Sequence, residues 1–187
     1  MKTLKLIFPG QRYSCDRSLL YFIDTNIEGD SVYFRYDYAR NIDLKSMTEK
    51  DIIKHAIDYS KKLFDNVDLS QYDEIILIAK SIGTYVAGYF RELFKLDSAR
   101  FICLTPVSSS LKYIRQNDFV LIGSLDKHIN SSELEKFKFA YPFFEIIDGV
   151  GHSLEYPNNL KATFDLQYKV CELALNYLDT ATKDILG

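Results

Sequence analysis

Short apolar runs alternate along the chain with longer segments that have helical periodicity. The runs are Leu4–Phe8, Ser31–Tyr36, Glu74–Ile78, Phe101–Leu104, Phe119–Gly123 and Phe143–Ile147. Most of them are continuously apolar rather than alternating. Continuous apolar character is typical of strands covered on both faces, which is the situation in parallel sheets. The pattern therefore predicts six strands in a mainly parallel sheet.

The segments between and after these runs carry helix signals. Ser46-Met-Thr-Glu49 and Ser132-Glu-Leu-Glu135 match the capping box, in which a hydroxyl and a carboxylate bind the exposed amides of a helix start. Apolar side chains recur every three or four residues from Leu160 to Leu178. Strand–helix alternation predicts a doubly wound α/β fold with helices on both faces of the sheet. Functional sites in such folds lie beyond the carboxyl ends of the strands.

Length and composition narrow the class of protein. With 187 residues and no linker, repeat or compositional break, residues 1–187 are expected to form a single domain. The 23 Lys and Arg against 26 Asp and Glu give a net charge of −3, dispersed along the chain, and therefore no electrostatic reason to bind nucleic acid.

Cysteine use and hydropathy predict the compartment. Three cysteines without a CxxC motif indicate free thiols and a reducing cytoplasm. The first apolar run is shorter than the roughly 7–15 residues in the apolar core of a signal peptide, and no run approaches the roughly 20 residues of a membrane span. We expect a cytoplasmic protein without a membrane span.

The most informative segment is Ala79-Lys80-Ser81-Ile82-Gly83, which stands between a predicted strand and a predicted helix. A serine on such a turn is held in a strained conformation with its hydroxyl exposed, and its neighbours two positions away must be small. Ser81 is equally well suited to be a plain helix N-cap. Lys80 beside it either tunes the local potential or faces solvent.

This segment resembles the G-x-S-x-G nucleophile elbow of the α/β-hydrolase superfamily, with Ala79 at the first glycine position. The resemblance covers nearly the whole chain in its layout and motif order. It implies a small serine hydrolase, similar to esterases and thioesterases, that lacks the two N-terminal strands and the lid common in the family. It also implies the chain order Ser, Asp, His for the catalytic residues.

Two residues match the remaining positions of that order. Asp126 follows the run Phe119–Gly123, and His152 follows the last run, Phe143–Ile147. His152 would be the base and Asp126 the acid that orients it. His128 is a less favoured base because it does not follow the last strand.

Asp148 and Glu155 are rival acids. Asp126 is favoured over both, and Asp148, only four residues before His152, would have to fold back tightly to meet its ring.

The resemblance also implies an oxyanion hole made of two backbone amides. One would belong to Ile82, directly after the nucleophile, and the other to Gln11 in the loop after the first strand. In that loop Gly10 matches the family glycine, while Pro9 stands where the family often has histidine. Arg12 and Tyr13 would lie at the mouth of the site and contact substrate.

Together these residues predict a hydrolase that cleaves an ester or thioester of a small acyl substrate through an acyl-enzyme. A catalytically silent binding domain and an acyltransferase that uses the same residues are the alternatives. No phosphate-binding glycine motif or zinc-ligand spacing occurs in the chain, so we expect neither a cofactor nor a metal.

Overall fold

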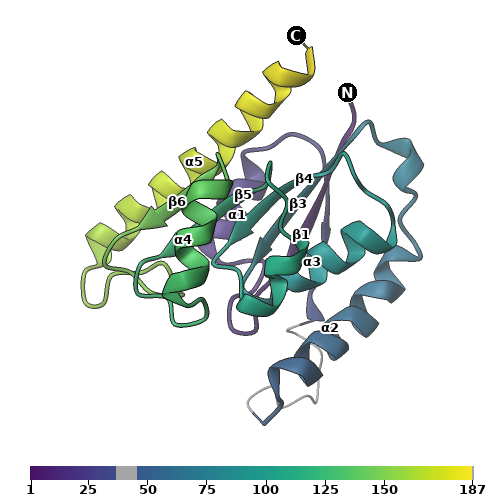
Figure 1. Ribbon diagram of the computed structural model, residues 1–187. Coiled ribbons are helices and arrows are strands. Elements are labelled where there is room, and N and C mark those ends of the chain that lie inside the picture. Colours follow the sequence, from purple (N-terminus) through teal and green to yellow (C-terminus); the bar gives the residue numbers. More distant parts are fainter. Residues whose placement is uncertain (37–45, 187) are drawn as a thin grey trace.

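The computed structural model describes residues 1–36 and 46–186 (Figure 1). Within them the strands are β1 (Thr3–Phe8), β2 (Asp30–Tyr33), β3 (Glu74–Lys80), β4 (Arg100–Leu104), β5 (Phe119–Gly123) and β6 (Phe144–Ile147). The α-helices are α1 (Ser18–Thr25), α2 (Glu49–Phe64), α3 (Ile82–Leu93), α4 (Ser131–Ala140) and α5 (Leu160–Leu186). Two short 3₁₀ helices, η2 (Leu69–Gln71) and η3 (Ser108–Tyr113), lie in connections.

The strands form one sheet in the order β2-β1-β3-β4-β5-β6, and every neighbouring pair is parallel. Each apolar run in the sequence corresponds to one of these strands, so the predicted fold class is confirmed. Most strand ends lie within one residue of the prediction, and two ends differ by more. β2 ends at Tyr33 rather than Tyr36, and β3 continues two residues beyond Ile78 to Lys80.

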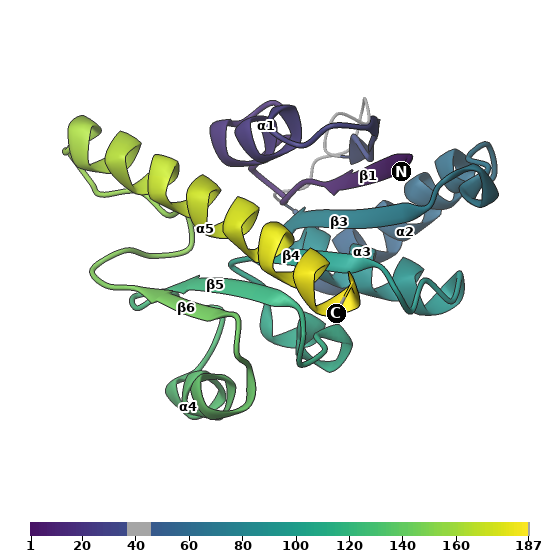
Figure 2. The same cartoon turned by 90° about the horizontal axis from the view of Figure 1, so that it is seen from above.

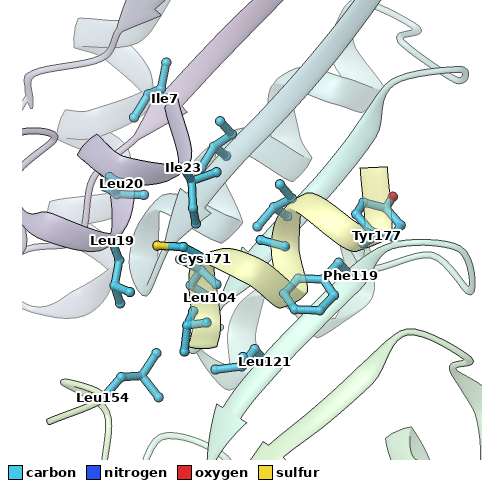
Figure 3. Packing of buried hydrophobic residues seen from close by; sticks show 14 of the residues in the cluster. Ile7, Leu19, Leu20, Ile23, Leu104, Phe119, Leu121, Leu154, Cys171 and Tyr177 are labelled. Carbon is cyan, nitrogen blue, oxygen red and sulfur yellow. The ribbon is translucent and has the colours of Figure 1, made fainter. Parts of the chain in front are cut away.

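Alternate side chains of each strand enter two separate hydrophobic clusters. Ile76 and Ile78 of β3 pack with α1 and α5, whereas Leu77 and Ala79 pack with α2 and α3. The period of two explains this division, since successive strand residues point to opposite faces. Figure 2 shows α1 and α5 together, and Figure 3 shows their side chains meeting those of the strands. Both faces are thus covered, as the continuous apolar runs require.

Both predicted capping boxes form two residues away from the expected positions. At the start of α2 the Thr48 hydroxyl accepts a hydrogen bond from the Asp51 amide, and the Asp51 carboxylate accepts one from the Thr48 amide. At α4, Asn130 and Glu133 make the equivalent reciprocal pair. The predicted pairs, Ser46–Glu49 and Ser132–Glu135, are therefore wrong.

The parallel arrangement brings the ends of all strands to one edge. The turns after β1, β3, β5 and β6 meet there, because parallel strands all end on the same side of the sheet. Gly123 at the end of β5 is in close contact with the loop after β6, since a Cβ on it would lie 2.3 Å from the Val150 carbonyl oxygen. No helix in the described part of the chain is long and apolar enough to cross a membrane.

Candidate active site

Ser81 occupies the turn between β3 and α3 in a strained conformation. Its φ of 57° and ψ of −131° lie where non-glycine residues are rare. Its amide donates to the Leu104 carbonyl at 3.0 Å, which ties the turn to the end of β4. Ser81 does not act as a side-chain cap for α3. The turn therefore holds the Ser81 hydroxyl away from the helix amides it would otherwise cap.

The close approach of neighbouring backbone explains the small residues around Ser81. A Cβ on Gly83 would lie 2.4 Å from the Phe8 carbonyl oxygen and 2.5 Å from that of Pro9. Ala79 is fully buried, and its methyl packs in the cluster beneath α2 and α3. The first position of the elbow thus accommodates a methyl group, whereas Gly83 has no room for one.

Three side chains from distant parts of the chain meet at this edge of the sheet. The Ser81 Oγ lies 2.7 Å from His152 Nε2, and His152 Nδ1 lies 2.7 Å from Asp126 Oδ2. The Asp126 carboxylate is buried and also accepts a hydrogen bond from the His128 amide at 2.9 Å. An ionised carboxylate only accepts, so the proton on His152 stands on Nδ1, and Nε2 is left to accept from the serine hydroxyl.

The surroundings set the charges of this group of residues. Burial raises the pKa of Asp126, but the hydrogen bonds from His152 and from the His128 amide outweigh it, and the pKa lies below its ordinary value. Burial lowers the pKa of His152, and although Asp126 opposes this, the net pKa is below the ordinary value of 6.5. At neutral pH the carboxylate is therefore ionised and the imidazole is neutral, as a base must be.

The rival residues do not replace Asp126 and His152 in these contacts, and the rival acid Glu155 lines the same cavity as His152. Asp148 accepts a hydrogen bond from the Ser124 hydroxyl at 3.0 Å. The ring of His128 lies 4.2 Å, centroid to centroid, from that of His152. His128 therefore borders the site without replacing His152 in the pair with Ser81.

Three potential metal ligands converge at one place among the described residues. They are Asp126, His128 and His152. Two of the three are already joined to each other by a hydrogen bond, and His152 is joined to Ser81. This pairing is suited to moving a proton between a hydroxyl and an imidazole.

The turn after β1 lies against the serine. Gly10 and Tyr13 form a tight bridge, with the Gly10 amide 2.9 Å from the Tyr13 carbonyl oxygen. A Cβ on Gly10 would lie 3.1 Å from the Cβ of Ser81, which places Gln11 at the edge of the site. Ile82 is the first residue of α3, so its amide has no acceptor within the helix.

A cavity of about 390 Å³ opens over Ser81 and His152. Gln11, Arg12 and Tyr13 contribute to its wall, as do Arg17 and Glu155. Arg12 is exposed, whereas Tyr13 is buried and its hydroxyl accepts a hydrogen bond from the Leu19 amide at 3.1 Å. The cysteines are not alternative nucleophiles here, because the thiols of Cys15, Cys103 and Cys171 are all buried.

Comparison with solved structures gives the fold a name. An alpha-beta serine hydrolase homologue from Coxiella burnetii superposes with a TM-score of 0.64 over 95% of this chain and 85% of its own, at 13% identity. A serine hydrolase without a lid from Xanthomonas campestris gives 0.60 over 94% and 81%, at 14% identity. The chain has the α/β-hydrolase fold.

A third similar structure is Est1E from Butyrivibrio proteoclasticus, solved with ferulic acid bound. It has a TM-score of 0.58 and 12% identity, over 95% of this chain and 90% of its own. No protein-family model and no curated protein sequence matches the chain. At such low identities the likeness establishes the α/β-hydrolase fold, and the chemistry has to be argued from the site.

One residue of this candidate site was not predicted from the sequence, and the role of another was left open there. Arg17, the residue before α1, lines the cavity. It was missed because α1 has no side-chain cap and no acidic residue in its first turn to mark where the helix begins. Lys80 is buried, with 1% of its surface exposed. The available signal was a lysine at the end of an apolar strand run. The direction of its side chain, however, depends on the residue at which β3 ends.

Proposed function

We propose that this protein is a serine hydrolase that cleaves an ester or thioester of a small acyl substrate through an acyl-enzyme. The observation that supports the proposal best is the pair of 2.7 Å contacts that His152 makes with Ser81 and with Asp126. These contacts join residues 71 and 26 positions apart in the chain. Proximity of a hydroxyl, an imidazole and a carboxylate in this order is what activates serine as a nucleophile.

In the proposed reaction the Ser81 Oγ attacks the carbonyl carbon of the substrate while His152 Nε2 takes the hydroxyl proton. Asp126 stabilises the imidazolium that forms and keeps the ring in the required tautomer. The amides of Ile82 and Gln11 would bind the oxyanion. As the tetrahedral intermediate collapses, the bond to the leaving alcohol or thiol breaks and His152 returns the proton to it. Water then hydrolyses the acyl-Ser81 ester by the same steps.

A fluorophosphonate probe tests this proposal, since it phosphonylates activated serines. We expect the probe to modify Ser81, identified by peptide mass spectrometry. Ser81→Ala should abolish labelling and lower hydrolysis of a simple ester by roughly 10³-fold or more. Ser70→Ala, which changes an exposed serine in η2, is the control and should label at the wild-type rate. An intact Ser81 after prolonged exposure would instead support a silent binding domain.

The charges at the cavity favour a substrate with a negatively charged group. Arg12 and Arg17 both line it, and within the described part of the chain neither arginine forms an ion pair. Glu155 is the single acidic side chain in the same wall. The guanidinium of Arg17 lies 5.7 Å from the centre of the Tyr13 ring, which holds it at the opening. We assign Arg12 and Arg17 to binding a carboxylate or phosphate on the acyl substrate.

Paired esters test this assignment. We expect the half ester of a dicarboxylic acid to be hydrolysed with a higher kcat/KM than the uncharged ester of the same length. Arg12→Gln and Arg17→Gln should each reduce that preference by about 10-fold, because charge-assisted hydrogen bonds contribute roughly 1.5–3 kcal/mol. The preference should also weaken as salt is added. Lys161→Gln removes an exposed positive charge on α5 and serves as the control. Equal kcat/KM for both esters would contradict the assignment.

A further inference from the structure

Lys80 is a buried charged residue directly before the proposed nucleophile. Because β3 extends to Lys80, the alternation of the strand points its side chain to the same face as Ile76 and Ile78, toward α1 and α5. Only 1% of the residue is exposed. The side chain therefore runs beneath the site rather than into solvent.

The Lys80 ammonium contacts three other segments of the edge that carries the site. It donates to the Thr105 hydroxyl at 2.7 Å, directly after β4, and to the His152 carbonyl oxygen at 2.8 Å, in the loop after β6. It also lies 4.9 Å from the centre of the Tyr13 ring, in the segment after β1. One amine thus connects the turn that holds Ser81 to the loop that holds His152.

Comparison with the other buried lysine shows how unusual this environment is. Lys5 forms an ion pair with Asp24 at 2.9 Å. In the described residues Lys80 has no carboxylate within ion-pair distance, and its acceptors are a hydroxyl and a carbonyl. Burying an ammonium without a counter-ion is costly, and an apolar side chain of similar length would fill the space without that cost. A contribution to stability therefore does not explain why a lysine stands at this position. Its hydrogen bond to the His152 carbonyl oxygen suggests instead a role in the reaction.

We propose that Lys80 is a positioning residue for His152: its amine anchors the backbone of the His152 loop to the strand that carries Ser81, and its charge keeps the imidazole ready to accept a proton. This inference rests on the proposed hydrolase function. Holding the His152 carbonyl fixes the start of its side chain, and the ring then reaches Ser81 and Asp126 together. Misplacement of a base by about 1 Å can cost about 100-fold in rate.

The charge of Lys80 acts on His152 in the pH range where the imidazole titrates. Burial lowers the pKa of Lys80 to about 7, although the negative charges of Asp126 and Glu155 oppose the shift. The amine is therefore positively charged below about pH 7, where a positive neighbour lowers the pKa of His152 further. The other groups that face His152 are Asp126, which raises its pKa, and His128, which lowers it. Lys80 thus keeps the base neutral under mildly acidic conditions.

The experiment measures the rate of fluorophosphonate labelling of Ser81 between about pH 5 and pH 9 in the wild type and in Lys80→Met. In the profile of labelling rate against pH, the acid limb is the part where the rate rises with pH as His152 loses its proton. We expect this limb to lie about half a pH unit or more higher in Lys80→Met than in the wild type, because a positive charge near the imidazole has been removed. We also expect the plateau rate to fall by about 10-fold or more. Lys80→Arg, which keeps the charge, should leave the acid limb near its wild-type position.

Lys5→Met is the matched control, since it removes the other buried lysine far from the site. It should lower the thermal midpoint and leave the acid limb where it is. A Lys80→Met variant that folds and shows the wild-type acid limb and plateau would overturn the inference.

A titration of the wild type by heteronuclear NMR tests the same coupling without a variant and without activity. The His152 imidazole signals should show a second inflection near pH 7, where Lys80 loses its proton. Absence of that inflection would overturn the role of the charge even if Lys80→Met does not fold. Failure of the proposed function is recognised separately, because wild-type Ser81 would then not label although the NMR inflection could still be present.

Discussion

At the scale of the residue, the position at which β3 ends decides whether the Lys80 side chain is buried or exposed. The sequence left two interpretations open for this lysine, an exposed side chain or a tuning charge. β3 continues two residues past the apolar run, and the pleat then directs Lys80 inward. Ser81, Asp126 and His152 were predictable because each follows a recognisable strand. Lys80 was not, since its direction depends on the residue at which the strand ends.

The lowered pKa of Lys80 predicts a specific dependence of stability on pH. In the unfolded chain the amine keeps its ordinary pKa of 10.5, whereas in the folded protein the pKa is about 7. Between these values the unfolded state binds a proton that the folded state lacks, so stability increases with pH. The gain is about 1.4 kcal/mol per pH unit.

Lys80→Met lacks this titration. We therefore expect the free energy of unfolding of the wild type to rise relative to that of the variant between about pH 7.5 and pH 9.5. Chemical denaturation of both proteins across this range measures the difference. Parallel curves for the two proteins would contradict the prediction.

At the scale of the element, the helices were found where apolar periodicity is strong, but the first residues of α2 and α4 were misplaced. Both observed capping boxes, Thr48–Asp51 and Asn130–Glu133, lie within two residues of the predicted ones. Each region contains several side chains that can cap a helix, and the local sequence does not choose between them. α1 was missed altogether. It has no side-chain cap and no acidic residue in its first turn.

Gly83, in the first turn of α3, has to lack a side chain because the loop after β1 packs against it beside Ser81. Gly83→Ala would place a methyl against two backbone carbonyls at 2.4 and 2.5 Å, and backbone cannot move as easily as a flexible side chain. We expect a loss of about 1–3 kcal/mol in the free energy of unfolding.

The matched control for this change is Gly151→Ala. There the new methyl would meet only the Leu125 carbonyl oxygen at 3.7 Å, an ordinary contact. Its stability should change by no more than about 0.5 kcal/mol. Urea denaturation of both variants makes the comparison, and equal losses would show that the contact at Gly83 relaxes.

At the scale of the whole molecule, a buried ion pair joins α3 to the segment before β5. Arg91 donates two hydrogen bonds to the Asp118 carboxylate, at 2.7 and 2.9 Å, and a further one to the Tyr113 carbonyl. Both side chains are almost completely buried. Burial raises the pKa of Asp118 even though Arg91 opposes the shift. The charged form of the Asp118 carboxyl group is therefore disfavoured by burial and stabilised by Arg91.

Removing one member of this pair should destabilise the whole molecule. Arg91→Met leaves a buried carboxylate without its partner, and we expect a loss of about 3–5 kcal/mol. The double variant Arg91→Met with Asp118→Asn removes the charge as well and should recover part of that loss. Thermal and denaturant unfolding measure both effects. A double variant less stable than Arg91→Met would contradict this explanation.

The sequence alone determined the parallel α/β architecture and the candidate residues Ser81, Asp126 and His152. It could do so because buried strands are recognisable from their apolar runs, and parallel strands all end at one edge. The tertiary structure decided which side chains surround those three residues. Lys80 meets His152 across 72 positions of the chain, and Arg17 reaches the cavity through a helix without local signals. Such contacts depend on how distant segments pack, which no local pattern encodes.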